Sequence, residues 1–153
     1  SVSKQYVQYN KVIKKPSNPK RSKYTFAGWY TDSKLTKAWD FNTKIKSGKT
    51  LYAKWKKISL KQAVISKVQN VSGKKIKVTV KKVSGADGYQ IQYSTKSNMK
   101  SAKTVTSSKT TTTISKLSKG KKYYVRVKAY KKDSTGKKVA GKWSKVKNLK
   151  VSK

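Results

Sequence analysis

The clearest alternation of apolar and polar positions runs through residues 123–130, Tyr-Tyr-Val-Arg-Val-Lys-Ala-Tyr. Side chains of a strand point alternately to opposite sides, so one face of this segment would be apolar and the other mixed. The apolar face would carry Tyr123, Val125, Val127 and Ala129, and the opposite face Tyr124, Arg126, Lys128 and Tyr130. We therefore predict a central, half-buried strand of a β-sandwich, around which the chain from about residue 60 onward is arranged.

The start of this strand has a second recognisable pattern. Leu117 stands six residues before Tyr123, and the polar turn Ser118-Lys119-Gly120 lies between them. A Leu, a short turn and then a Tyr opening a strand are typical of a tyrosine corner, in which the phenol hydroxyl bonds to backbone a few residues upstream. We predict such a hydrogen bond for Tyr123.

Short segments with the same period recur at regular intervals along the second part of the chain. We predict strands at residues 64–71, 75–81, 89–93, 104–106, 110–114, 123–130 and 143–151, with turns at 85–88 and 133–136. The inward positions would hold Ile76, Val78, Val80, Tyr89, Ile91 and Tyr93. Seven short strands separated by turns are typical of a β-sandwich.

Trp143 is predicted to lie outside the core of this sandwich. The last two strands would be hairpin neighbours, so its ring would lie over the outward row that contains Arg126, Lys128 and Tyr130. An outward Trp beside cations gains cation–π attraction.

The first part of the chain is richer in aromatic residues and more interrupted. Residues 2–13 are predicted to form one or two short strands around a turn at Asn10-Lys11, and the prolines make 15–19 a loop. Short apolar clusters separated by Gly, Asp and Ser then indicate a small sheet, with Phe26, Trp29, Phe41, Leu51 and Trp55 mostly interior. An aromatic platform for sugars or nucleobases is the alternative, and it could use Trp29, Tyr30, Trp39, Tyr52 and Trp55.

Three segments of this first part carry a family resemblance. Residues 26–32 (Phe-Ala-Gly-Trp-Tyr-Thr-Asp), 40–43 (Asp-Phe-Asn-Thr) and 51–55 (Leu-Tyr-Ala-Lys-Trp) resemble the Listeria–Bacteroides repeat, or internalin B-repeat, over residues 6–57. The resemblance implies a small β-grasp-like module of bacterial surface proteins, here assigned to residues 1–57. The family's opening strand would precede Tyr6, so we expect an N-terminally truncated module with one open strand edge.

Residues 60–153 resemble a fibronectin type III domain, which we assign to residues 58–153. The resemblance rests on residues 86–93 (Ala-Asp-Gly-Tyr-Gln-Ile-Gln-Tyr), on Leu117 with the strand 123–130, and on 141–144 (Gly-Lys-Trp-Ser). It implies a seven-strand sandwich of the kind found near the C-terminus of Gram-positive surface proteins. Val80 stands where the family commonly has a core Trp, so we expect Tyr89 and Tyr93 to fill that space. The predicted fold class is all-β.

The charge is extreme and evenly spread. Lys and Arg number 41 against 4 acidic residues, a formal net charge of +37, divided as +13 for residues 1–57 and +24 for 58–153. Lysines that interleave with apolar residues can simply fill solvent-facing strand positions and protect strand edges. A selected affinity for an anionic polymer is the other interpretation, and because the lysines belong to no recognisable pocket we expect it to be non-specific.

Catalytic and metal-binding chemistry has little support in the composition. The chain has no His, Cys or Glu, so acid–base catalysis would fall to four Asp, to Lys or to Tyr. Turn Asp residues that accept backbone hydrogen bonds explain Asp32, Asp40, Asp87 and Asp133 more simply. We therefore assign no catalytic, cofactor-binding or metal-binding residue and predict no cofactor.

These observations favour a non-catalytic extracellular module pair from the C-terminal region of a bacterial surface or secreted protein. It would act as a spacer or adhesive segment, with anionic cell-wall polymers, acidic polysaccharides or other domains of the parent protein as partners. No apolar run is long enough to span a membrane, and any export signal would lie upstream. The alternatives are the accessory tail of an exported hydrolase and a lysine-rich nucleic-acid binder, although base readout and phosphate clamping favour Arg over Lys.

Overall fold

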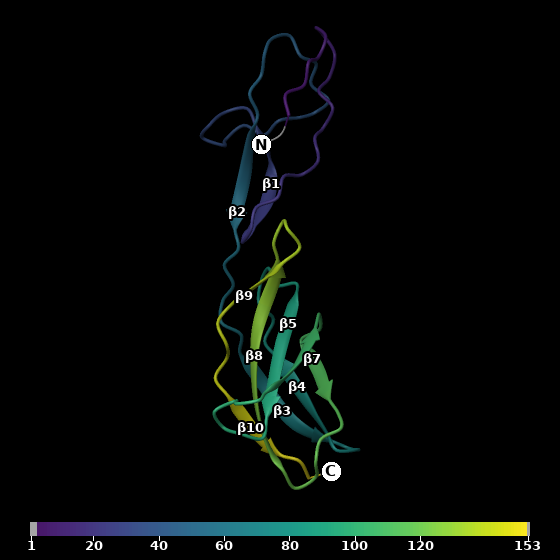
Figure 1. The fold of residues 1–153 in the computed structure, drawn as a ribbon, viewed down its shortest axis with the longest axis vertical. Helices are drawn as coiled ribbons and strands as arrows, with labels where there is room; N and C mark the ends of the chain where they lie inside the picture. The colour runs from purple at the N-terminus through teal and green to yellow at the C-terminus, as the bar shows by residue number, and fades with distance from the viewer. Residues whose placement is uncertain (1–2, 153) are drawn as a thin grey trace. The chain divides into compact units, whose positions relative to one another are not determined.

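The structure is a computed structural model that describes residues 3–152, and these residues form strands, turns and loops without a helix. The chain divides into two compact units. The first comprises residues 1–58 with the loop 133–137, and the second comprises 59–132 and 138–153. Figure 1 draws the strands as arrows and labels most of them.

The second unit is a β-sandwich of two antiparallel sheets. One sheet has the order β3-β4-β7, and the other has the order β10-β8-β5-β6, with β9 also paired to β8. The strands are β3 (Ile65–Val71), β4 (Lys75–Val80), β5 (Gly88–Ser94), β6 (Lys103–Ser107), β7 (Thr111–Ile114), β8 (Lys122–Lys132), β9 (Lys138–Ala140) and β10 (Lys147–Lys150). The long strand β8 pairs with β5, β9 and β10, so it is central, as its alternation predicted. The predicted all-β class and sandwich are confirmed.

The core of the sandwich is filled by the inward positions of the alternating strands. Branched aliphatic side chains are the most completely buried, because they pack densely between two pleated sheets. The fully buried residues include Ile76, Val78, Ile91, Val125, Val127 and Val151. Val80 and Tyr89 lie in the same core cluster, and Tyr93 packs against it while staying partly exposed.

Two tyrosine hydroxyls tie the ends of strands to neighbouring backbone. The Tyr123 hydroxyl accepts a hydrogen bond from the Ser118 amide at 3.2 Å, which confirms the predicted tyrosine corner. The Tyr89 hydroxyl accepts one from the Val83 amide at 2.9 Å. Both phenol groups are therefore partnered although their rings are buried.

The prediction of a single last strand over residues 143–151 is wrong. The return from the hairpin loop begins as β9, leaves regular pairing over residues 141–146, and pairs again as β10. Within the irregular stretch, the Ser144 amide donates to the Val127 carbonyl, and the Ser144 hydroxyl accepts from the Val127 amide. The side chain of Ser144 thus replaces a ladder bond, which the alternation of the sequence could not reveal.

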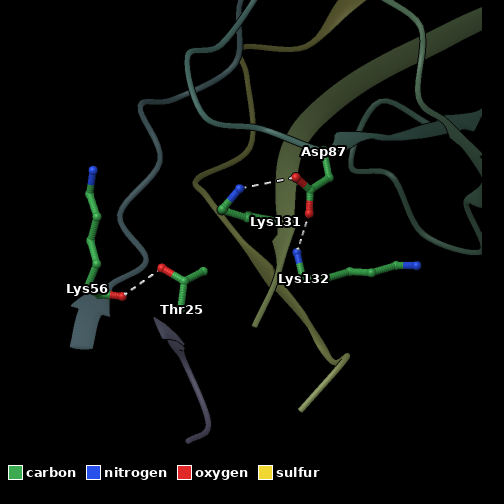
Figure 2. A network of polar contacts seen from close by, with 5 residues as sticks. All are labelled: Thr25, Lys56, Asp87, Lys131 and Lys132. Atoms are coloured by element: carbon green, nitrogen blue, oxygen red, sulfur yellow. Dashed lines mark hydrogen bonds and ion pairs between the residues drawn. The ribbon is translucent and has the colours of Figure 1, made fainter. Parts of the chain in front are cut away.

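The first unit holds one two-stranded antiparallel sheet, β1 (Tyr24–Tyr30) with β2 (Tyr52–Lys57). Their register shifts between Phe26 and Trp29, where Gly28 adopts a φ of 118° that other residues rarely adopt. The Thr25 hydroxyl also bonds to the Lys56 carbonyl at 3.3 Å (Figure 2). On its other edge β1 is partly paired, because Tyr30 bridges Ala38 and the Trp29 carbonyl accepts the Trp39 amide, whereas β2 has no second strand beside it among residues 3–152.

The strands predicted for residues 2–13 do not form in the described part, residues 3–13. Asn10 adopts a left-handed φ of 64° in a turn, and Val12 makes an isolated bridge to Lys44. The Asn10 amide and the Lys11 carbonyl both bond to Ile45. This segment therefore pairs with the loop at residues 44–45, which is too short a partner for a strand ladder.

The predicted interior of the first unit is only partly formed. Trp29 is buried, whereas Phe26, Phe41, Leu51 and Trp55 are half-buried. Phe26 makes edge-on contacts with Trp29 and Trp55, at ring-centroid distances of 5.4 and 5.6 Å. A two-stranded sheet has no facing layer, so its aromatic residues can shield one another without being closed off from solvent.

Candidate functional site

The basic side chains dominate the surface chemistry of both units. None of the Lys and Arg residues between positions 3 and 152 is buried. Over the same residues, one ion pair with a carboxylate forms, between Lys131 and Asp87 at 3.2 Å. The positive charge is therefore almost uncompensated, which creates a positive potential over the surface.

Asp87 forms hydrogen bonds with the central strand β8 and not with the backbone of its own turn. It accepts hydrogen bonds from the Lys132 amide at 2.7 Å and from the Lys131 ammonium group at 3.2 Å (Figure 2). The Lys132 amide bond is the main reason that the pKa of Asp87 lies below its usual value. We predicted a local turn role for this Asp, and the structure replaces it with a link across 45 residues of sequence.

The other three carboxylates do serve turns, as predicted. Asp32 accepts from the Thr36 and Lys37 amides, and the Thr36 bond chiefly lowers its pKa. Asp40 accepts from the Asn42 amide. In the loop between β8 and β9, hydrogen bonds from the Thr135 hydroxyl, the Lys23 amide and the Thr135 and Lys137 amides lower the pKa of Asp133 to about 2.

These carboxylates each have their own hydrogen-bond partners. No group of three or more metal-ligating Asp, Glu, His or Cys side chains forms within the described part of the chain. Asp32, Asp87 and Asp133 are bonded to backbone amides, which lower their pKa values and hold them in the ionised form. The arrangement offers structural anchors rather than a general base.

The five candidate platform residues of the first unit are mostly covered. Trp29 is buried, Tyr30, Trp39 and Trp55 are half-buried, and Tyr52 is exposed. Cations lie over some of these rings, with Lys54 at 4.6 Å from the Tyr30 ring centre and Arg21 at 6.0 Å from that of Trp55. A sugar-stacking platform needs open ring faces, so this geometry favours the packing role.

The first unit also contains a cavity of about 640 Å³ beside Trp29. Residues 3–16 and 45–51 supply most of its lining, including Tyr6 and Tyr9, which are largely exposed. The buried indole N–H groups of Trp29 and Trp39 find no hydrogen-bond partner among residues 3–152. Incomplete packing in this unit agrees with the bare edge of its strand β2.

Trp143 lies outside the sandwich core, as predicted. Arg126 and Lys128 each place their charged group 4.5 Å from the centre of its ring. The Arg126 guanidinium also donates two hydrogen bonds to the Gln92 side-chain oxygen, at 2.9 and 2.7 Å. Tyr130 has the Lys138 ammonium group 4.8 Å from its ring centre, although Tyr130 itself is only 7% exposed.

The expectation that no pocket gathers lysines is wrong for one place in the second unit. A cavity of about 220 Å³ is lined by four lysines: Lys96, Lys100, Lys103 and Lys116. Tyr93, Leu117 and Tyr123 line it too, with Ser94, Thr95 and Ser101. These residues come from three separate stretches of sequence, so no spacing in the chain signals the cavity.

Among residues 3–152, no helix is long and apolar enough to cross a membrane.

Comparison with known proteins assigns both parts of the chain to domain families. Residues 1–54 match the Listeria-Bacteroides repeat domain, and residues 65–142 match the fibronectin type III domain. Domains of these families usually occur in extracellular or surface proteins and are typically non-catalytic.

Two proteins of Evansella cellulosilytica are similar to this chain over about a third of its length. One, called "Putative Gly-rich membrane protein", is 47% identical over 55 residues, which are 35% of this chain and 6% of that protein. The other, called "Putative membrane protein", is 42% identical over 55 residues, or 35% of this chain and 8% of that protein. The chain thus spans less than a tenth of the length of these curated relatives.

Solved fibronectin type III structures resemble this chain over about two thirds of its length. The chicken CNTN1 FN1-FN3 domains align with a TM-score of 0.52 at 22% identity, covering 68% of this chain and 37% of theirs. The sixth fibronectin type III domain of a human fibronectin type III domain containing protein aligns with a TM-score of 0.50 at 19% identity, covering 63% and 90%. At these identities the likeness concerns the fold alone. With the family match spanning just over half of its residues, the chain belongs to the fibronectin type III domain family, and a Listeria–Bacteroides repeat precedes that domain.

Proposed function

We propose that this chain is a non-catalytic spacer and adhesive segment of a Gram-positive cell-surface or secreted protein, with non-specific affinity for anionic polymers of the cell wall. Wall polymers that carry phosphate or carboxylate groups would be its partners. The affinity would come from many weak contacts with lysines rather than from one recognition site.

The uncompensated charge carries this proposal. A formal charge of +37 is set against a single carboxylate ion pair in residues 3–152, and the basic side chains there remain accessible to solvent. A polyanion that neutralises several lysines releases its condensed counterions, which makes binding favourable at low salt and weak at high salt. The family matches support the extracellular, non-catalytic part of the proposal.

Retention on a matrix of heparin or purified wall polymer tests the affinity across a salt series. We expect strong retention at low salt and complete elution well below about 1 M, where the screening length falls to ~3 Å. DNA of scrambled sequence should retain the protein comparably at equal charge density. Retention that survives 1 M salt, or a clear preference for one neutral glycan, would contradict non-specific attraction.

Two sets of exposed lysines provide matched variants. One set, in the first unit, changes Lys11, Lys14, Lys44 and Lys46 to Gln; the other, in the second unit, changes Lys67, Lys81, Lys82 and Lys142 to Gln. Both sets should lower the elution salt on the long polymer by similar amounts, while Arg at the same positions should preserve it. Loss of retention from one set alone would mean that a local site dominates.

A further inference from the structure

The lysine-lined cavity of the second unit differs from the rest of the basic surface because the fold assembles it. Its residues come from the end of β5, from the connection to β6, from the start of β6, from the segment after β7 and from β8. Strands of both sheets therefore lead into one opening. We call the ten lining residues the lysine pocket; they are Tyr93, Ser94, Thr95, Lys96, Lys100, Ser101, Lys103, Lys116, Leu117 and Tyr123.

The loop that carries two of the lysines is held in a defined shape. The buried Ser94 hydroxyl donates to the Lys100 carbonyl at 2.9 Å and accepts from the Lys96 amide at 3.1 Å. The Met99 amide donates to the Lys96 carbonyl at 3.0 Å, and the Met99 side chain is buried. A single serine thus bridges Lys96 and Lys100, so neither residue belongs to a free loop.

Left-handed backbone conformations cluster at the same place. Met99, Ser101 and Lys116 have φ values of 61°, 56° and 59°, in the region that favours glycine. Side-chain-bearing residues in this region are sparsely populated and persist only where their surroundings hold them. At Lys116 the conformation is adopted directly beside the buried Leu117, which anchors that wall of the pocket.

The electrostatics of the lysine pocket select an anion. Four lysines line it, and no acidic residue in the described chain does. The described carboxylates are bonded elsewhere in the fold, so they are not available to neutralise these cations. A carboxylate in the opening would be attracted by all four ammonium groups, and each of these is a compact point charge on a flexible stem.

The remaining lining residues define the class of anion. Tyr93, which is partly exposed, supplies aromatic surface, and its ring centre lies 6.3 Å from that of the buried Tyr123. Thr95 and Ser101 are exposed and supply hydroxyl groups. Aromatic surface with a few polar groups is the usual lining of a small-ligand site, and about 220 Å³ lies below the ~300–1,000 Å³ of drug-sized pockets. A single ring that carries one negative charge would fit a cavity of this volume.

We infer that the lysine pocket binds a single acidic sugar residue, a pyranose that carries a carboxylate, within a linear anionic polysaccharide. This inference rests on the proposed function and adds one built subsite to it. The overall positive field draws in the polymer, and the pocket holds one sugar of it. A short oligosaccharide spans few surface lysines, so its binding depends on the pocket far more than that of a long polymer does.

The test uses the full 153-residue chain, labelled for NMR and titrated with tetragalacturonate, a tetramer of uronic acids, at about 0.1 M salt. The pocket variant changes Lys96, Lys100, Lys103 and Lys116 to Gln. The matched control changes Lys67, Lys81, Lys82 and Lys142 to Gln, so that both lower the formal charge from +37 to +33. All eight lysines are exposed, and thermal melting checks that both variants fold as the wild type does.

We expect saturable shifts of the Tyr93, Ser94 and Lys103 amides and at least a tenfold weaker affinity in the pocket variant. The control should lose no more than threefold. Equal losses in the two variants would overturn the lysine pocket and leave the non-specific proposal standing. If wild-type protein failed to bind heparin or wall polymer at low salt, the proposed function itself would fail, and this result is separate from the comparison of variants.

Three further ligands separate acidic sugars from other chemistry. Maltotetraose has the rings without the charge and should give no saturable shifts. Tripolyphosphate has charge without rings, and oligothymidylate of four nucleotides has phosphates with bases. Both should bind at least tenfold more weakly than the uronate and lose affinity equally in the two variants. Pocket-dependent binding of either one as tight as the uronate would overturn the acidic-sugar assignment.

Discussion

At the scale of single residues, polar groups that have specific hydrogen-bond partners contribute more to folding stability than the many exposed lysines do. The Tyr123 ring is 9% exposed, and its hydroxyl accepts the Ser118 amide five residues upstream. A partly buried amide that loses its acceptor lowers the stability of the fold, whereas the loss of charge on an exposed lysine changes stability little. We therefore expect substitutions of the hydrogen-bonded Tyr and Asp residues to change stability more than substitutions of exposed lysines.

Replacing Tyr123 by Phe should lower the free energy of unfolding of the second unit by about 1–3 kcal/mol, because the Ser118 amide would lose its acceptor. Urea unfolding followed by tyrosine and tryptophan fluorescence measures this change. Tyr124→Phe, one residue along the same strand but half-buried, is the matched control and should change stability by less than about 0.5 kcal/mol. Equal effects of the two substitutions would show that the hydrogen bond between Ser118 and Tyr123 does not stabilise the second unit.

The lowered pKa values of three carboxylates predict that the protein loses stability in acid. The folded pKa of Asp133 lies at about 2, below the ordinary 3.8, chiefly because the Thr135 hydroxyl bonds to its ionised form, and Asp32 and Asp87 are shifted in the same direction. A depressed folded pKa contributes stability that is fully present above the unfolded value and is lost as pH falls toward the folded one. The melting temperature should therefore fall between about pH 4 and pH 2.

Asp133→Asn checks the assignment by thermal melting over the same pH range. The variant should melt lower than wild type at neutral pH and show a smaller decrease on acidification. Because Asp32 and Asp87 remain, part of the pH dependence should persist. Identical pH profiles for wild type and variant would show that Asp133 does not contribute.

At the scale of elements, the outward face of β8 is organised by a tryptophan from the irregular segment between β9 and β10. Arg126 and Lys128 both lie 4.5 Å from the Trp143 ring centre, so the ring links cations two positions apart on the strand. Gln92 of β5 holds the Arg126 guanidinium from the other side. The segment around Trp143 is thereby attached to β8 although it lacks regular pairing.

A double-mutant cycle of Arg126→Gln and Trp143→Leu should give a coupling energy of about 0.5–1 kcal/mol, the range for partly exposed cation–π pairs. The same cycle with Lys145→Gln, an exposed lysine outside this contact, should give none. Urea unfolding of the single and double variants provides the energies. A coupling energy of zero for Arg126 and Trp143 would show that their contact does not stabilise the fold.

Close packing between β5 and its neighbours depends on a glycine. A Cβ atom at Gly88 would lie 2.6 Å from the Ser107 carbonyl oxygen and 2.8 Å from the Tyr130 hydroxyl. Gly88→Ala should therefore destabilise the second unit by about 1–3 kcal/mol, as overpacking does. Ser84→Ala, at an exposed position of the preceding turn, is the control and should be nearly neutral in thermal melting. A wild-type melting temperature for Gly88→Ala would mean that β5 and β6 can separate at little cost.

At the scale of the whole molecule, the two units differ in how much apolar surface they bury. The sandwich has a continuous core of aliphatic and aromatic residues from both sheets. Between residues 3 and 58, Trp29 is the one buried hydrophobic residue. A two-stranded sheet with so small a core is marginal by itself, whereas a complete sandwich meets the usual requirement for independent folding.

Separate expression of residues 58–153 and 1–57 tests this difference. The longer fragment should melt cooperatively as a monomer. The shorter one should be partly unfolded or should pair with a second copy through its bare strand edge. Circular dichroism and analytical ultracentrifugation give the two readouts. A monomeric, cooperatively melting fragment 1–57 would show that its aromatic cluster suffices.

Local patterns in the sequence determined most of the sandwich. Alternation over residues 75–81 and 123–130 predicted strands and their inward faces, because the two-residue period depends only on neighbouring positions. The tyrosine corner at Tyr123 followed from Leu117 and the turn after it, and Trp143 lies outside the core as predicted, although it sits in an irregular segment and not in the predicted strand. Over residues 3–13 the pattern failed, because a strand also needs a partner of matching length.

The tertiary structure decided where distant residues meet. Asp87 reaches the backbone of Lys132, Ser144 takes over a ladder bond at Val127, and the lysine pocket joins β5, β6, β8 and the segment after β7. Each of these contacts joins positions far apart along the chain. Alternation records which side of a strand a residue faces but not which strand lies beside it. For this reason thirty-nine lysines looked equivalent in the sequence, and only the pairing of the sheets set four of them around one cavity.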